Sequence, residues 1–187
     1  MKDTIIIVEG PQGAGKTTFT NYLREKIPAD LYRLSGIKEK GITGLEKSKA
    51  RYSNLLEYMK NSENVNMIFD RTFFSEEIYS RLGYKPYSFS ETYNELLEKL
   101  DSLDFEIYLV ILYLEDTVEY EERIKGREKH QYQKFELEES IKQQEAYLKL
   151  ADEVEQKTKK IKVIKFNNNA SQDFEKNMDK QLGYLFK

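Results

Sequence analysis

Apolar residues gather in short runs that recur along the whole chain. Four of these runs are rich in β-branched residues and have the length of strands buried in a sheet. They are Thr4–Glu9, Val65–Asp70, Phe105–Glu115 and Ile161–Phe166, and Leu31–Leu34 is a shorter fifth candidate. The pattern therefore predicts about five strands.

Between these runs, apolar residues recur three and four positions apart, which is the spacing of an amphipathic helix. Pro28 marks the end of the first helix, and Ser88-x-x-Glu91 resembles a capping box. The expected helical faces are Phe19–Ile27, Tyr52–Met59, Tyr93–Leu100, Lys134–Glu155 with Leu137, Ile141 and Leu148 inward, and a helix from near Ser171 packed by Phe174, Met178 and Leu182.

Strands that alternate with helices are typical of an α/β domain with a parallel sheet covered on both faces. We expect three layers in a single domain over residues 1–187, because no repeat or linker interrupts the chain. The run Asn167–Asn169 is interpreted as a loop that follows a strand.

A glycine-rich turn joins the first apolar run to the first amphipathic helix. It fits the pattern G-x-x-x-x-G-K-[ST], whose glycines let backbone N–H groups approach phosphate oxygens. Lys16 would reach the β- and γ-phosphates, and the Thr17 hydroxyl would ligate Mg²⁺. We therefore expect ATP and Mg²⁺ as cofactors. The expected nucleotide-binding residues are Gly10, Pro11, Gln12, Gly13, Ala14, Gly15, Lys16, Thr17 and Thr18.

Asp70 and Arg71 end the second strong apolar run, where strands of an open α/β sheet face the ligand crevice. Asp70 could orient Mg²⁺, and Arg71 could bind an anionic phosphate through two hydrogen bonds. The alternative is an ion pair at the surface after a strand. With the glycine turn at the same edge of the sheet, we favour the functional interpretation.

A basic stretch between the strand ending at Glu115 and the long polar helix carries Arg123, Lys125, Arg127 and Lys129. These cations could close over transferring phosphates as a lid over about residues 119–134. The alternative is a solvated helix face whose charges are balanced by neighbouring glutamates.

Composition and charge exclude several classes of protein. The chain has 187 residues, a net charge of −3, no cysteine and a single histidine, His130. The absence of cysteine excludes disulfides and thiolate metal sites. The low net charge gives no sign of the excess of basic residues that stable nucleic-acid binding requires. The first apolar run is too short for a signal peptide or a membrane span, so we expect a soluble cytoplasmic protein without a membrane partner.

Other phosphate-binding classes match poorly. A GTPase would carry Asp-x-x-Gly after the second strand and an Asn-Lys-x-Asp loop, and neither is present. The run Arg33–Gly36 matches a transporter ATPase signature at only three positions.

The chain resembles the thymidylate kinase and deoxynucleoside kinase group of P-loop kinases along most of its length. The start IIIVEGPQGAGKTTF is similar to the family's strand and glycine turn, and Asp70–Tyr79 is similar to its Asp-Arg-Tyr-x-x-Ser-x-x-x-Tyr pattern. Arg51 stands 20 residues before Arg71, as a phosphate-contacting arginine does in thymidylate kinases. Arg123–Arg127 resembles the family's lid.

The resemblance implies a P-loop kinase fold and phosphoryl transfer from ATP to a pyrimidine deoxynucleoside or its monophosphate. A homodimer is also implied. Phe73 and Phe74 either stack on the acceptor base or are core residues. The implied catalytic residues are Glu9, Lys16, Asp70, Arg71, Arg123 and Arg127, and the implied acceptor-binding residues are Glu9, Gln12, Arg51, Arg71, Phe73 and Phe74.

The acceptor stays open between two classes. Arg51 and Arg71 favour a monophosphate, whereas Glu9 could take the proton from the 5′-hydroxyl of a nucleoside. Gln12 stands where thymidylate kinases have an aspartate, and Asp70-Arg71-Thr72 stands where deoxynucleoside kinases have Glu-Arg-Ser. More distant alternatives are a kinase for a modified base or a small metabolite, and a nucleotide-binding module without catalysis.

Overall fold

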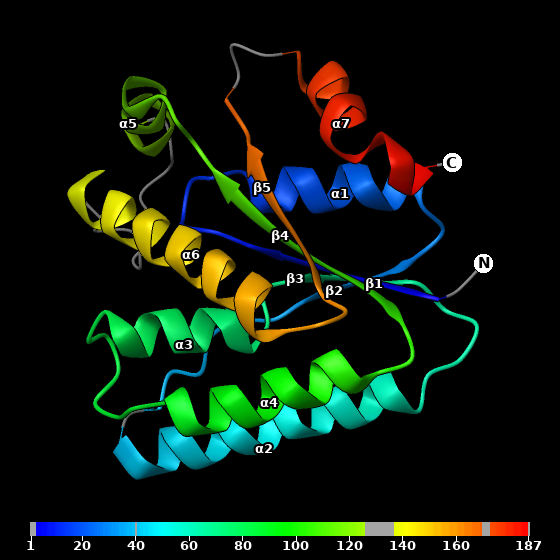
Figure 1. Ribbon diagram of the computed structural model, residues 1–187. Coiled ribbons are helices and arrows are strands. Elements are labelled where there is room, and N and C mark those ends of the chain that lie inside the picture. The colour runs from blue at the N-terminus through cyan, green and yellow to red at the C-terminus, as the bar shows by residue number, and fades with distance from the viewer. Residues whose placement is uncertain (1–2, 40, 126–136, 170–172, 187) are drawn as a thin grey trace.

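The computed structural model describes residues 3–39, 41–125, 137–169 and 173–186 (Figure 1). Its strands are β1 (Thr4–Glu9), β2 (Asp30–Arg33), β3 (Met67–Asp70), β4 (Glu106–Tyr113) and β5 (Lys162–Asn167). Its helices are α1 (Lys16–Lys26), α2 (Gly41–Lys60), α3 (Phe73–Arg81), α4 (Ser90–Ser102), α5 (Thr117–Lys125), α6 (Leu137–Lys157), α7 (Phe174–Leu182) and a 3₁₀ turn, Gly183–Phe186.

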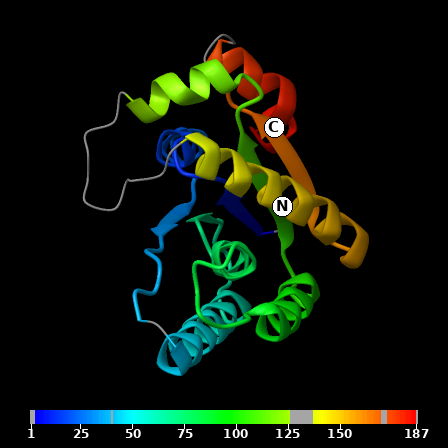
Figure 2. The same ribbon diagram turned by 90° about the vertical axis from the view of Figure 1, so that its left-hand side faces the viewer.

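The five strands form one parallel sheet in the order β2-β3-β1-β4-β5. Successive side chains of a strand point to opposite faces, so β1 contributes to two cores. Ile5 and Ile7 pack with residues of α2, α3, α4 and α6, whereas Ile6 and Val8 pack with residues of α1 and α7. Figures 1 and 2 show these helices on the two faces of the sheet, which confirms the predicted three-layer architecture.

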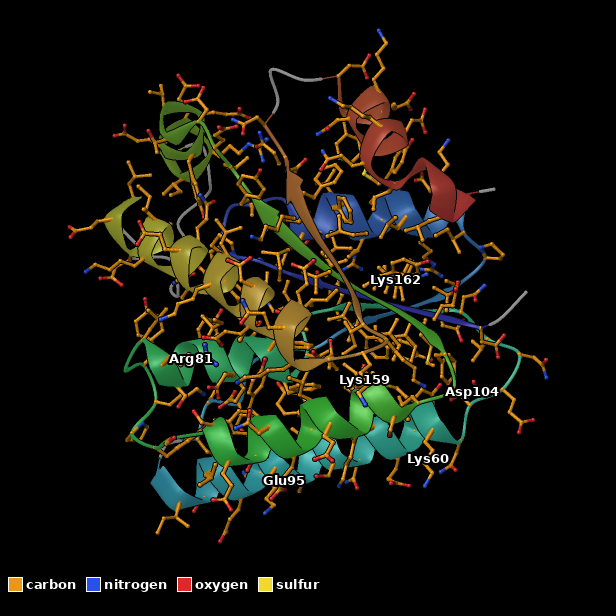
Figure 3. The ribbon with its side chains drawn as sticks, viewed as in Figure 1. Lys60, Arg81, Glu95, Asp104, Lys159 and Lys162 are labelled. Atoms are coloured by element: carbon orange, nitrogen blue, oxygen red, sulfur yellow. The ribbon has the colours of Figure 1, made fainter. Side chains whose placement is uncertain are left out.

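Two helices, α3 and α5, were not predicted from periodicity. In α3 the buried residues include Ser75, Glu76 and Glu77 as well as Phe73 and Phe74. Polar residues on the buried side hide the amphipathic pattern on which sequence analysis relies. Figure 3 shows Arg81 at the end of α3, where its guanidinium pairs with Glu77 and with Glu153 of α6.

The inward face of α6 also differs from the prediction. Leu137, Ile141 and Leu148 are only half-buried. The buried residues are Ser140, Gln143, Tyr147, Leu150, Ala151 and Val154. The buried face of α6 differs from the expected one because it includes polar residues near the N-terminus, which apolar spacing does not reveal.

The capping box predicted at Ser88 and Glu91 is wrong. Helix α4 begins at Ser90, and its N-cap is Phe89, which makes no side-chain capping bond. Ser88 therefore lies outside the capping position. Among the described residues, no helix combines the length and apolarity that crossing a bilayer requires.

Candidate active site

The carboxyl ends of the strands bring the predicted polar residues to one edge of the sheet. Glu9 ends β1 and Asp70 ends β3, and Val8 is opposite Asp70 in the strand register. Arg33 ends β2, and its Nε lies 3.6 Å from Oδ2 of Asp70. The glycine turn leaves β1 at this same edge. This edge is therefore the candidate active site.

The phosphate loop, residues 10–17, has the backbone that its glycines were expected to provide. Gly10, Gly13 and Gly15 have φ values of 150°, 85° and 89°, which disfavour residues with a side chain. A Cβ on Gly10 would also lie 2.7 Å from the carbonyl oxygen of Leu112. The loop ends at the N-terminus of α1, where backbone N–H groups and the helix dipole attract anions.

Lys16 is buried against the loop. Its Nζ donates hydrogen bonds to the carbonyl oxygens of Gly10 at 2.9 Å and Pro11 at 2.8 Å. Thr17 and Thr18 are exposed in the first turn of α1. The cation, the hydroxyls and the glycine backbone fit a nucleoside triphosphate.

The donors available to Mg²⁺ are hard oxygens, as this ion prefers. The Thr17 hydroxyl is exposed, and the Asp70 carboxylate is largely buried beside Arg33. Among the described residues, no group of three or more acidic or histidine side chains could hold a metal by itself. The residues therefore fit a Mg²⁺ ion that takes most of its ligands from phosphates and water.

Glu9 is fully buried, and both of its carboxylate oxygens accept hydrogen bonds. Oε1 accepts from the backbone N of Thr72 at 2.6 Å, and Oε2 accepts from Oγ of Ser75 at 2.5 Å. Ser75 Oγ in turn lies 2.9 Å from the hydroxyl of Tyr147. Burial raises the pKa of Glu9 to about 7, against the opposing effects of these hydrogen bonds and of the charges on Arg71 and Lys16.

Arg71 has φ 71°, a left-handed backbone that is uncommon outside glycine. Its backbone N donates to the carbonyl of Val8, and its guanidinium donates to the hydroxyl of Tyr79. This conformation occurs directly after β3, at the candidate site. Strained backbone of this kind is often found at functional positions.

A cavity of about 220 Å³ opens between the phosphate loop and α3. Its lining residues are Gln12, Leu34, Ser35, Gly36, Tyr52, Arg71, Ser75, Glu76 and Tyr79. A second hollow of about 700 Å³ lies at the opposite end of the sheet, lined by Lys60 and Asp104 among others (Figure 3). The smaller cavity is the better candidate because it adjoins the phosphate loop.

Glu76 is a site residue that the sequence analysis missed. It is buried in the cavity wall, accepts a hydrogen bond from the hydroxyl of Tyr87, and lies 3.6 Å from Nζ of Lys85. In the Asp-Arg-Tyr-x-x-Ser-x-x-x-Tyr pattern, Glu76 falls on a position where any residue is allowed.

Three residues expected at the acceptor site are placed differently from the expectation. The rings of Phe73 and Phe74 are fully buried, stack on each other at 4.5 Å and contact Tyr93 in the core. The core alternative is therefore correct, and base stacking by these rings is wrong. Arg51 does not line the cavity, although its guanidinium donates to the carbonyl of Ser35, which does.

Arg123 lies on α5 beside the phosphate loop. Its NH2 donates to Oε1 of Glu119 at 2.7 Å and to the carbonyl of Asn168 at 2.6 Å. Arg127 and residues 126–134 of the predicted lid lie outside the described residues. The asparagine run interpreted as a plain loop contacts the site, because Asn168 Nδ2 donates to the carbonyl of Ala14 at 2.8 Å.

No protein-family model and no curated protein matches the sequence. Solved structures do match. The YorR protein of Bacillus subtilis, solved in complex with phosphorylated GDP, is 18% identical with a TM-score of 0.66, over 97% of this chain and 94% of that chain. Deoxyadenosine kinase from M. mycoides with bound dATP is 19% identical with a TM-score of 0.65, over 98% of this chain and 100% of that chain.

Thymidylate kinase from Candida albicans is 16% identical with a TM-score of 0.62, over 98% of this chain and 91% of that chain. These likenesses extend over nearly the whole chain. They confirm the fold predicted from the glycine turn and the alternation of strands and helices: this chain has the fold of P-loop nucleoside and nucleotide kinases.

Proposed function

We propose that this protein transfers the γ-phosphoryl group of ATP to a nucleoside monophosphate, with a pyrimidine deoxynucleotide as the leading acceptor. The observation that carries the proposal is the 220 Å³ cavity, which is lined by Gln12 of the phosphate loop and by Arg71. An acceptor in this cavity would lie next to a triphosphate held by the loop. Placing two reactants side by side is the main requirement of phosphoryl transfer.

The geometry supports a monophosphate over a nucleoside. A monophosphate is already an anion and needs a cation to hold it, which Arg71 supplies. A neutral hydroxyl benefits from a base. Glu9 is fully buried, has both oxygens hydrogen-bonded and does not line the cavity. In this arrangement the nucleoside alternative lacks access to its expected base.

The phosphate loop is proposed to bind ATP, the phosphoryl donor. Lys16 and the N–H groups of the loop would bind the phosphates, while Thr17 and Asp70 would hold Mg²⁺. The ion would neutralise charge on the phosphates during transfer. Arg123 is within reach of the loop and, with Arg127, is proposed to add positive charge there. Similar structures of deoxyadenosine kinase and thymidylate kinase support a kinase of this general kind.

The test is ADP release measured with ATP, Mg²⁺ and a panel of deoxynucleosides and their monophosphates. Turnover with monophosphates is expected. Turnover with nucleosides alone would contradict the acceptor class. ATP binding without turnover on any acceptor would favour a nucleotide-binding module. A homodimer stays a prediction, which light scattering on the purified protein tests, and no stable nucleic-acid partner is proposed.

Replacing Arg71 tests the acceptor site directly. Losing a charge-assisted hydrogen bond costs about 1.5–3 kcal/mol, so we expect Arg71→Ala to raise the KM for the acceptor roughly 10- to 100-fold. The KM for ATP should change little. Arg24→Ala, at an exposed position in the last turn of α1, is the matched control. Equal effects on both KM values would contradict the role assigned to Arg71.

A further inference from the structure

Among the described residues, two side chains from elements other than the phosphate loop and α1 donate hydrogen bonds to carbonyl oxygens of the loop. The hydroxyl of Tyr120 on α5 donates to the carbonyl of Gln12 at 2.6 Å. Nδ2 of Asn168, directly after β5, donates to the carbonyl of Ala14 at 2.8 Å. Both residues are buried, with exposed fractions of 0% and 7%. We call this pair the carbonyl anchors.

The other carbonyl contacts of the loop come from the loop itself or from α1, where Oγ1 of Thr20 donates to the carbonyl of Thr17 at 3.1 Å. Lys16 donates to the carbonyls of Gly10 and Pro11, and the backbone N of Phe19 donates to the carbonyl of Gly15. The anchors therefore act on two peptide groups that the loop's own contacts do not hold.

The direction of a carbonyl fixes the direction of the N–H group in the same peptide. In a trans peptide the two groups point in opposite directions within one plane. No peptide bond in the described residues is cis. A carbonyl of Gln12 directed at Tyr120 therefore turns the N–H of Gly13 the other way. The same holds for the carbonyl of Ala14 and the N–H of Gly15.

The glycines that carry these N–H groups are fitted closely to the anchors. A Cβ built on Gly13 would lie 3.2 Å from Cε1 of Tyr120, and a Cβ on Gly15 would lie 2.7 Å from Nδ2 of Asn168. The absence of a side chain at both positions lets each anchor approach the backbone. The close fit agrees with the hydrogen bonds, and a side chain on either glycine would crowd its anchor.

The anchors are themselves held in place. The backbone N of Asn168 donates to the carbonyl of Tyr113 at 2.8 Å, and its carbonyl accepts from Arg123 at 2.6 Å. Asn169 Nδ2 donates to Oε2 of Glu119 at 2.8 Å. The end of β4, the residues after β5 and helix α5 thus form one hydrogen-bonded frame around the loop.

We propose that Tyr120 and Asn168 are positioning residues that direct the N–H groups of Gly13 and Gly15 toward the phosphates of the bound nucleotide. The inference rests on the proposed role of the loop as the ATP site. It assigns to Tyr120 of α5 and to Asn168 after β5 a part in nucleotide affinity that is separate from the positive charge proposed for Arg123.

The test uses Tyr120→Phe, which removes only a hydroxyl, and Asn168→Ala, which removes the donor without adding a charge. A neutral hydrogen bond contributes about 1 kcal/mol, so each variant should weaken ATP binding roughly fivefold. The KM for the acceptor should not change. The measurements are equilibrium binding of a fluorescent ATP analogue, the KM values for ATP and acceptor, and the melting temperature.

Matched controls separate positioning from stability. Tyr58→Phe removes a hydroxyl bonded to Tyr32, and Asn66→Ala removes bonds to Thr4 and Pro28 at the opposite end of the sheet. The controls should lower the melting temperature without weakening ATP binding.

Three further results would decide against the anchor inference, the kinase proposal or both. If the anchor variants bind ATP as tightly as the unmodified protein and only melt earlier, the anchors are structural and the inference is wrong. If the unmodified protein binds ATP but phosphorylates no acceptor, the kinase proposal fails while the binding measurements still test the anchors. If it binds no nucleoside triphosphate, both fail.

Discussion

At the scale of single residues, Glu9 is a carboxylate in an environment that disfavours its charged form. Its carboxylate is fully buried, and desolvation raises its pKa from an ordinary value of 4.5 to about 7. The folded protein therefore binds a proton more tightly than the unfolded chain does. The contribution of Glu9 to the free energy of unfolding is greatest below pH 4.5. It falls as the pH rises to about 7, where the Glu9 carboxyl of the folded protein also ionises.

The pH dependence of unfolding tests this environment. The difference between 4.5 and about 7 corresponds to a loss of about 3 kcal/mol across that range. Glu9→Gln cannot ionise and should lack this component. Urea unfolding of both proteins at pH 5 and pH 8 is the measurement. Identical pH profiles would show that Glu9 keeps an ordinary pKa.

Sequence analysis was strongest for residues whose chemistry is local. The phosphate loop was predicted residue by residue because its motif is contiguous. Asn168 was missed because its partner lies far away in sequence: Asn168 and Ala14 are 154 positions apart. Glu76 was missed because the Asp-Arg-Tyr-x-x-Ser-x-x-x-Tyr pattern allows any residue at its position. Phe73 and Phe74 were left open because aromatic rings after a strand can face either a ligand or the core.

At the scale of elements, buried polar residues explain why helix α3 and the inward face of α6 were misjudged. Sequence patterns assume that buried positions are apolar, but α6 buries Ser140 and Gln143, and α3 buries Ser75 and Glu77. The Oγ of Ser140 is buried without a hydrogen-bond partner among the described residues. An unsatisfied buried hydroxyl destabilises the fold.

Ser140→Ala is therefore expected to stabilise the protein by about 1 kcal/mol, since alanine also favours the helix. Urea denaturation measures the change. Ser80→Ala is the matched control with the opposite sign, because Ser80 Oγ donates to the carbonyl of Tyr87 and accepts from the backbone N of Phe89. A destabilised Ser140→Ala variant would show that the hydroxyl has a partner.

At the scale of the whole molecule, the parallel sheet and its helices were predictable, whereas the order of the strands was not. Alternating strands and helices imply a parallel sheet. The central position of β1, between β3 and β4, depends on pairings between strands that are not consecutive in the chain. That order places Glu9 and the phosphate loop between Asp70 on one side and the end of β4 on the other.

A nucleotide that binds only the folded protein must stabilise the whole molecule. At 100 times its dissociation constant, ATP with Mg²⁺ should add about 2.7 kcal/mol, which a rise in melting temperature reports. Lys16→Ala should abolish this rise and the turnover, while the protein still unfolds cooperatively without nucleotide. Lys49→Ala, at an exposed position on α2, should respond to ATP like the unmodified protein. A full response of Lys16→Ala would contradict the site.

The contact between Asn168 and Ala14 also has a consequence for the time at which the protein acquires its site during synthesis. The glycine turn leaves the ribosome early, but Tyr120 and Asn168 follow more than a hundred residues later. A nascent chain that ends before β5 carries the complete motif and Tyr120, but it lacks the second carbonyl anchor, Asn168. On the anchor proposal, such a chain would bind ATP more weakly than one in which β5 has paired with β4 and Asn168 has reached the loop.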